Sequence, residues 1–250
     1  MKRRQLSRVP SSAAARRVFK MAGTAESLED AVRLIARDYT EEVICPPTDL
    51  EAIARRLNIY DIQSEDMPLS GELRRNGKGF TLVYSSYLSG GRKRFTIAHE
   101  IGHAIVLQSG PRSPTRGREL EWICDLFAVE LLMPHSVFLD MATAEPSAQA
   151  VKELATKFQT SLAATGIRYA TLKAVSVFQV EDGERVVWGS GLVKAGSVRN
   201  LDYSLRDAVS TTPINSGSSI IFYSHPLWTG EWKLSWESVG KQKLFVFYPA

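Results

Sequence analysis

The sequence predicts an α+β fold, in which helices and a small mixed sheet are followed by a β-rich region at the end of the chain. Three observations support this prediction. Apolar residues recur at helical spacing in several stretches between residues 28 and 172. Three short runs between residues 59 and 84 have the composition of strands. After residue 175 the apolar residues alternate along the chain, as they do in strands.

The first 20 residues differ in charge from the rest of the chain. They hold seven basic residues and no acidic one, and without them 24 Lys and Arg face 27 Asp and Glu. The overall charge of +4 therefore belongs to this segment. It has no apolar core of the signal-peptide kind, so we expect residues 1–24 to form a basic disordered tail, with weak nucleic-acid contact as the alternative.

The remaining composition is that of a soluble globular protein. No apolar run reaches the length of a membrane span, and Cys45 and Cys124 provide no disulfide framework. We therefore expect a cytoplasmic chain without a membrane partner. We expect three further segments, at residues 25–145, 146–174 and 175–250.

Two helices and three strands are predicted in the first part of the 25–145 segment. Ser27 begins a helix that runs to about Tyr39, and Thr48-Asp49 begins another that runs to Leu57. Strands are predicted at residues 59–62, 71–74 and 80–84, with Asn76-Gly77 as a turn between the last two. The basic run 90–94 is expected to be a solvated loop, because positive charge is unfavourable at a helix N-terminus.

The stretch from Phe95 to Leu107 has helical periodicity and contains an HExxH pattern. His99 and His103 are four residues apart, so on a helix both imidazoles can reach one metal ion. Glu100 lies beside the first histidine and is placed to act as a general base toward water. This pattern is typical of zinc peptidases.

A further helix, predicted at residues 119–133 after the HExxH helix, offers a third metal ligand. Catalytic zinc takes three protein ligands and keeps one position open. Glu121 and Asp125 share one face of this helix, so Glu121 is the favoured ligand and Asp125 the carboxylate that orients a ligand histidine. Glu119 is the rival ligand, but it has no acidic residue four positions later.

RFTIAHEIGHAIV, the ExxxD pattern and the ending FAVELLMP occur here in the order found in the ImmA/IrrE-type metallo-endopeptidases, which this chain resembles over about residues 48–172. Cys124 departs from the family, which usually has alanine there. The resemblance implies a zincin-like domain with Zn²⁺ as cofactor. It also implies, as substrate, a helix-turn-helix repressor or antitoxin that controls a mobile element or stress response.

The strand at residues 80–84 comes directly before the HExxH helix. We expect it to be an edge strand that pairs with an extended substrate, with Phe80, Leu82 and Tyr84 as substrate contacts. The alternative is an ordinary strand within the sheet.

Residues 146–174 are expected to form a helix-turn-helix-like pair, with four basic residues that could contact phosphates: Lys152, Lys157, Arg168 and Lys173. A pair that only packs on a neighbour is the alternative. The final segment is expected to hold a hairpin with an Asp182-Gly183 turn and three further strands. Trp232, Leu234 and Trp236 alternate onto one face and indicate a small core. A DNA-associated regulator, or a switch that binds a repressor without cutting it, is the functional alternative.

Overall fold

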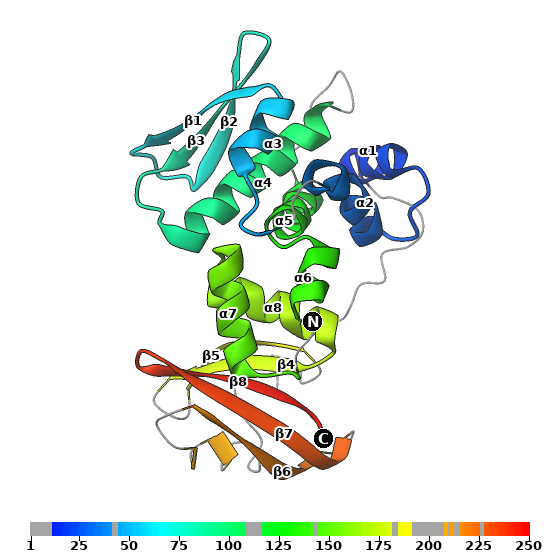
Figure 1. Cartoon of the computed structure of the whole chain (residues 1–250). Helices are drawn as coiled ribbons and strands as arrows, with labels where there is room; N and C mark the ends of the chain where they lie inside the picture. Colours follow the sequence, from blue (N-terminus) through cyan, green and yellow to red (C-terminus); the bar gives the residue numbers. More distant parts are fainter. Residues whose placement is uncertain are drawn as a thin grey trace. The chain divides into compact units, whose positions relative to one another are not determined.

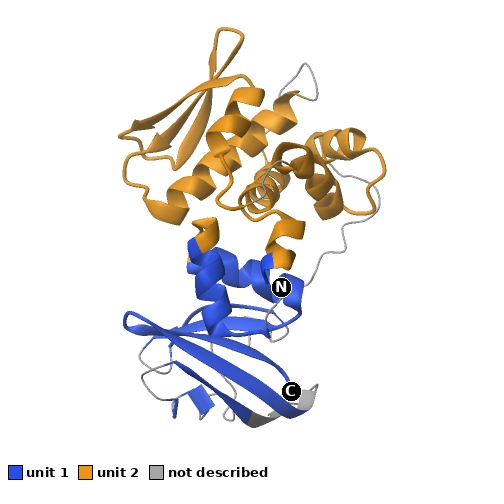
Figure 2. Cartoon of the chain, viewed as in Figure 1, with its two compact units in different colours: residues 1–3, 141–156, 162–250 blue, residues 4–140, 157–161 orange. Residues whose placement is uncertain are grey.

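A computed structural model describes residues 12–41, 45–108, 117–142, 145–181, 185–191, 208–209, 211–212, 216–225 and 228–250. These residues form two compact units (Figures 1 and 2). Of the described residues, the N-terminal unit comprises 12–140 together with 157–161, and the C-terminal unit comprises 141–156 and those from 162 onward. The basic residues before Ser12 lie outside the described ranges.

The first nine elements of the chain begin in the N-terminal unit. They are α1 (Ala13–Ala22), α2 (Leu28–Thr40), α3 (Leu50–Arg56), β1 (Ile59–Glu65), β2 (Gly71–Asn76), β3 (Gly79–Ser85), α4 (Gly90–Gln108), α5 (Arg118–Leu132) and α6 (His135–Met141). Ser27 and Asp49 cap α2 and α3, because their side-chain oxygens accept the backbone N–H groups of Asp30 and Ala52. The mixed α+β class expected from the sequence is confirmed.

Helix α1 lies within the segment expected to be a disordered tail, and that expectation is wrong for residues 13–22. Ser12 caps the helix by accepting the N–H of Ala15 at 3.1 Å. Ala14, Ala15 and Val18 are buried, and α1 contacts α2 and α5. Burial of this small apolar face holds a helix whose outer face is basic.

The small sheet has the strand order β1-β3-β2, so β3 is its central strand. Residues 80–84 pair in parallel with β1 and antiparallel with β2. The expectation that this strand is an edge strand open to a substrate is therefore wrong, because both of its hydrogen-bonding sides are occupied. The edge strands are β1 and β2.

Helix α4 begins at Gly90, earlier than the sequence predicts. The basic run 90–94 is thus the first turn of the helix rather than a loop. Helix α4 then crosses α5 closely: a Cβ atom on Gly102 would lie 3.0 Å from Cβ of Phe127 and 3.2 Å from Cα of Cys124. This close approach brings the polar faces of the two helices together.

The C-terminal unit contains a five-stranded antiparallel sheet with two helices. Its elements are most of α7 (Ala148–Phe158), then α8 (Leu162–Lys173), β4 (Ser176–Glu181), β5 (Arg185–Ser190), β6 (Gly217–His225), β7 (Trp228–Val239) and β8 (Gln242–Pro249). The strand order is β5-β4-β8-β7-β6. The turn expected between the first two strands lies outside the described residues.

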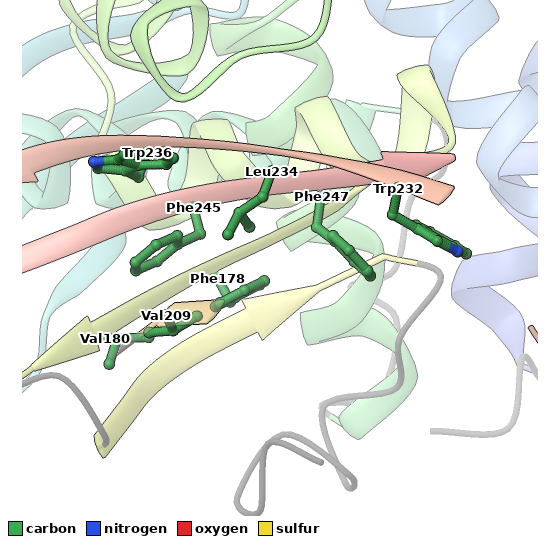
Figure 3. Close-up of a cluster of buried hydrophobic side chains, with 8 residues drawn as sticks. All are labelled: Phe178, Val180, Val209, Trp232, Leu234, Trp236, Phe245 and Phe247. Carbon is green, nitrogen blue, oxygen red and sulfur yellow. The ribbon is translucent and has the colours of Figure 1, made fainter. Parts of the chain in front are cut away.

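An aromatic cluster fills one face of this sheet (Figure 3). Phe178 and Phe245 stack with ring centroids 5.3 Å apart, and Trp232 stacks on Phe247 at 4.4 Å. The small core expected from the alternation of Trp232, Leu234 and Trp236 is confirmed, since all three side chains are buried in this cluster.

Helices α7 and α8 belong to the opposite face. The N–H of Ala148 donates to Oγ of Ser235, and a Cβ on Gly166 would meet the Trp188 ring at 2.4 Å. Three of the four basic residues expected to contact phosphates are occupied within the unit or buried: Lys152 pairs with Glu237, Lys173 donates to the Ala142 carbonyl, and Arg168 is buried. These contacts thus favour the alternative expectation, a helix pair that packs on a neighbour, over a DNA-binding surface.

Within the described ranges, no single helix has the length and apolar composition needed to cross a membrane. Helices α5 and α6, which meet at a 47° bend, satisfy the criterion only when they are taken together.

Candidate metal centre

Helix α4 presents His99 and His103 one turn apart on the same face. Their ring centroids are 5.0 Å apart and the ring planes are nearly perpendicular. The two side chains are 16% and 20% exposed, so each imidazole is shielded but still reachable from solvent. Two nitrogen donors therefore converge at one point beside α5.

Helix α5 supplies a carboxylate at the same point. Oε2 of Glu121 lies 3.3 Å from Nε2 of His99 and 3.7 Å from Nε2 of His103. The Glu121 side chain is 53% exposed. The residue favoured from the sequence as third ligand thus brings one oxygen close to both imidazoles.

Asp125 contacts the His99 imidazole at Nδ1, the nitrogen that does not face Glu121. Nδ1 of His99 donates to Oδ1 of Asp125 at 2.9 Å, which leaves the lone pair of Nε2 facing Glu121. Burial acts to lower the pKa of His99, but the hydrogen bond to Asp125 and the charges of Glu100, Asp125 and Glu121 outweigh it and raise that pKa. This arrangement fixes the tautomer that a metal ligand needs.

Cys124 is a second candidate for the third donor. A donor nitrogen of each imidazole and Sγ of Cys124 all lie within 4.8 Å of one another. The thiol is fully buried, however, and burial raises its pKa far above the ordinary value. Glu121, whose Oε2 lies 3.3 and 3.7 Å from the Nε2 atoms of the two imidazoles, stays the ligand expected from the sequence.

Glu100 lies beside the donors in a buried position. It is 7% exposed and packs against β2, where a Cβ on Gly71 would lie 3.1 Å from Oε1 of Glu100. Burial raises the pKa of Glu100 to about 7; His99 opposes the shift, while Glu121 and Glu72 add to it. A carboxyl group with a pKa near neutrality can both accept and return a proton.

The donor set fits a divalent metal ion. Bonds of about 2.0–2.2 Å at tetrahedral angles separate two N or O ligands by roughly 3.3–3.6 Å. Of the distances from Glu121 to the two imidazoles, 3.3 Å falls in this range and 3.7 Å lies 0.1 Å above it. Two imidazoles and one carboxylate are also the ligand types of hydrolytic zinc sites. Three protein donors are also the number that holds a catalytic zinc ion.

The structure brings together His99, Glu100, His103, Glu121 and Asp125, and their roles stay predictions. It does not bring Phe80, Leu82 and Tyr84 to an open edge, because they lie on the central strand. The residue that the sequence prediction missed is Gly71, at the start of edge strand β2. The available signal was a glycine in a strand, which often marks a close approach of another chain segment.

Part of this chain, including the residues of the metal centre, is similar in sequence to known proteins. Residues 53–169 match the family model described as an IrrE N-terminal-like domain. The "Radiation response metalloprotease IrrE" of Deinococcus radiodurans is 38% identical over 80 residues, which cover 28% of this chain and 24% of that protein. The match thus spans about a quarter of the relative's length.

A solved structure, titled "Mycobacterium tuberculosis transcriptional regulator", has a related fold. The TM-score is 0.54 at 11% sequence identity, with 96% of this chain and 81% of that chain covered. At this identity the likeness concerns the fold alone.

Proposed function

We propose that this chain is a zinc-dependent endopeptidase that cleaves a protein substrate, since residues 53–169 match the IrrE N-terminal-like family model and part of the chain is similar to a metalloprotease. The observation that carries the proposal is the position of one Glu121 oxygen within 3.7 Å of both imidazoles, next to a buried Glu100. A structural zinc site would not need a carboxyl base beside its ligands.

Each residue of the site has a distinct task in this proposal. His99, His103 and Glu121 would hold the ion, and Asp125 keeps Nε2 of His99 available as a donor. Zinc, when bound, supplies Lewis-acid polarisation of a carbonyl and activation of water. Glu100 accepts the proton of the attacking water and transfers it to the leaving amine.

The edge strand β2 would align the substrate. Its hydrogen-bonding side away from β3 is not part of the sheet ladder, and Gly71 lies directly against Glu100 and Thr96. An extended peptide that adds to this edge would run past the base. In this proposal β2 pairs with the substrate, in place of residues 80–84.

The substrate in this proposal is a helix-turn-helix repressor or antitoxin, so that cleavage controls a mobile element or stress response. Its support is the resemblance of the HExxH, ExxxD and FAVELLMP motifs to the ImmA/IrrE-type endopeptidases. The name of the Deinococcus relative, a radiation response metalloprotease, is in line with a regulatory protease.

The test is co-incubation of the zinc-loaded protein with the helix-turn-helix regulator encoded nearest its gene. Wild type and Glu100→Gln are compared by intact mass. We expect one discrete cut by the wild type and none by the variant. Equal cutting by both would indicate a contaminating protease and would overturn the role of Glu100.

Binding without cutting is the outcome that would replace this proposal. If both proteins bind the regulator in a pull-down assay and neither yields a product with zinc bound, the chain acts as a switch. A DNA-associated regulator is less favoured, because three of the four cations on α7 and α8 are paired or buried.

A further inference from the structure

A cavity lies in the N-terminal unit, at the beginning of α4. Its volume is about 830 Å³, within the range of small-molecule sites. The lining includes Gly90, Gly91, Lys93 and Arg94 of α4, with Thr48 before α3 and Tyr84 of β3. None of the metal-site residues lines it, so it is a separate feature.

The first turn of α4 presents an unusual charge pattern to this cavity. Helix N-termini carry a partial positive charge and N–H groups without intrahelical partners. Here the first turn contains no acidic residue, and the basic residues Lys93 and Arg94 line the cavity near the start of the helix. The charges of the side chains add to the helix dipole instead of offsetting it, which favours an anion at this end.

Two buried polar atoms of residues in the lining also indicate that an anion binds here. Thr48 is only 2% exposed, and its Oγ1 has no hydrogen-bond partner among the described residues. The NH2 group of Arg94 donates to the Thr48 carbonyl at 2.9 Å, but its buried Nε has no such partner. Buried donors are normally satisfied, so these two atoms indicate an acceptor that binds here.

The acidic residues in the lining are already engaged. Asp49 caps α3 through Ala52 and acts on the charge of Arg94. Glu51 pairs with Arg55 at 3.4 Å. Lys93 is held with Nζ 4.7 Å from the centroid of the Tyr84 ring. The two cations of the lining thus belong to α4, beside an aromatic ring, whereas its two carboxylates belong to the start of α3.

The lining also includes the apolar side chains of Leu50, Ile62 and Ile97. We propose that this cavity binds a small organic phosphate, with the phosphate at the N-terminus of α4 against Thr48, Lys93 and Arg94, and the organic group on Tyr84 and Ile97. A phosphate dianion matches two cations and several N–H donors better than a single carboxylate does.

The proposal is tested by calorimetric titration of the metal-loaded protein with phenyl phosphate, inorganic phosphate and benzoate. We expect phenyl phosphate to bind most tightly, because it uses both parts of the cavity. Lys93→Ala and the isosteric Thr48→Val should each weaken its binding by about tenfold, the usual effect of losing a hydrogen bond to a charged group. The matched control is Arg92→Ala, an exposed residue outside the lining, which should change binding by less than about twofold.

Amide resonances of the labelled protein locate the ligand. Shifts at Gly90 and Gly91 upon addition of phenyl phosphate would support the site. The proposal is overturned if benzoate binds as tightly as phenyl phosphate, if Arg92→Ala weakens binding as much as Lys93→Ala, or if binding survives in both Lys93→Ala and Thr48→Val.

Discussion

The imidazole of His99 is held by the carboxylate of Asp125, with Nδ1 and Oδ1 2.9 Å apart. Loss of such a partner typically lowers metal affinity by about 10–100-fold, because the ligand loses its fixed orientation and some of its basicity. We therefore expect Asp125→Ala to bind zinc about 10–100-fold more weakly in a competition with a chromophoric chelator. Asp140→Ala, an exposed change on α6, is the control and should retain full affinity. Equal affinity in both variants would show that Asp125 does not orient the ligand.

The third ligand can be identified by comparing two variants of neighbouring residues on α5. Glu121→Gln removes the anionic donor and should weaken zinc binding by more than about 100-fold, since one of three protein ligands is lost. Cys124→Ala should leave zinc affinity within about threefold of wild type, because its buried thiol stays protonated. Cobalt substitution provides a second measurement: a sulfur-to-cobalt charge-transfer band that disappears in Cys124→Ala would assign the ligand to Cys124 instead.

Burial of Glu100 predicts a pH-dependent loss of stability in the metal-free protein. Its pKa rises from an ordinary 4.5 to about 7 in the fold, so below pH 4.5 the carboxyl is protonated in both states and costs nothing. Between pH 4.5 and about 7 the unfolded chain ionises this carboxyl while the folded state keeps it protonated, so stability is lost as the pH rises to about 7. Glu100→Gln should therefore be more stable than wild type by roughly 2–3 kcal/mol at pH 8, and by almost nothing at pH 4.

Urea unfolding at the two pH values measures this difference. Glu51→Gln changes an exposed carboxylate on α3 and should show no comparable gain at pH 8. A difference between Glu100→Gln and wild type that is the same at pH 4 and pH 8 would mean that the carboxyl is not buried as a charge.

The contact between Gly71 and Glu100 predicts that β2 tolerates no side chain at this position. A Cβ there would lie 2.6 Å from Cγ2 of Thr96 and 3.1 Å from two atoms of Glu100. Gly71→Ala should reduce kcat/KM for peptide cleavage by at least about tenfold, because a displaced base loses its alignment. Gly117→Ala is the matched control, since nothing lies within 4 Å of its added Cβ. Full activity in Gly71→Ala would place the substrate elsewhere.

The helices of the site could be predicted because their chemistry is local. The spacing of His99 and His103 needs only one helix, and that of Glu121 and Asp125 only another. The meeting of the two helices depends on Gly102, whose small size lets α5 approach. Family motifs gave this pairing from the sequence, whereas the spacing alone could not.

The order of strands in the small sheet could not be predicted in the same way. Residues 80–84 precede α4 in the chain, but strand order depends on contacts that are distant in sequence, including the parallel pairing of β1 with β3. The helical start of α4 was missed for a different reason. A dipole penalty of about 0.3–1 kcal/mol per charge is smaller than the gain from packing the helix, so the basic run 90–94 remains helical.

The aromatic cluster of the C-terminal unit leads to a last prediction. Phe245 is fully buried and stacks on Phe178 with the two rings tilted by only 14°. Removing a buried phenylalanine side chain typically costs about 3–5 kcal/mol, because apolar contacts are lost and a cavity remains. We expect Phe245→Ala to lower the free energy of unfolding by this amount. Urea unfolding measures it, with tryptophan fluorescence as the signal. Val187→Ala on β5, where the side chain is 46% exposed, should cost less than about 1 kcal/mol, and equal losses in the two variants would mean that this face of the sheet is not a packed core.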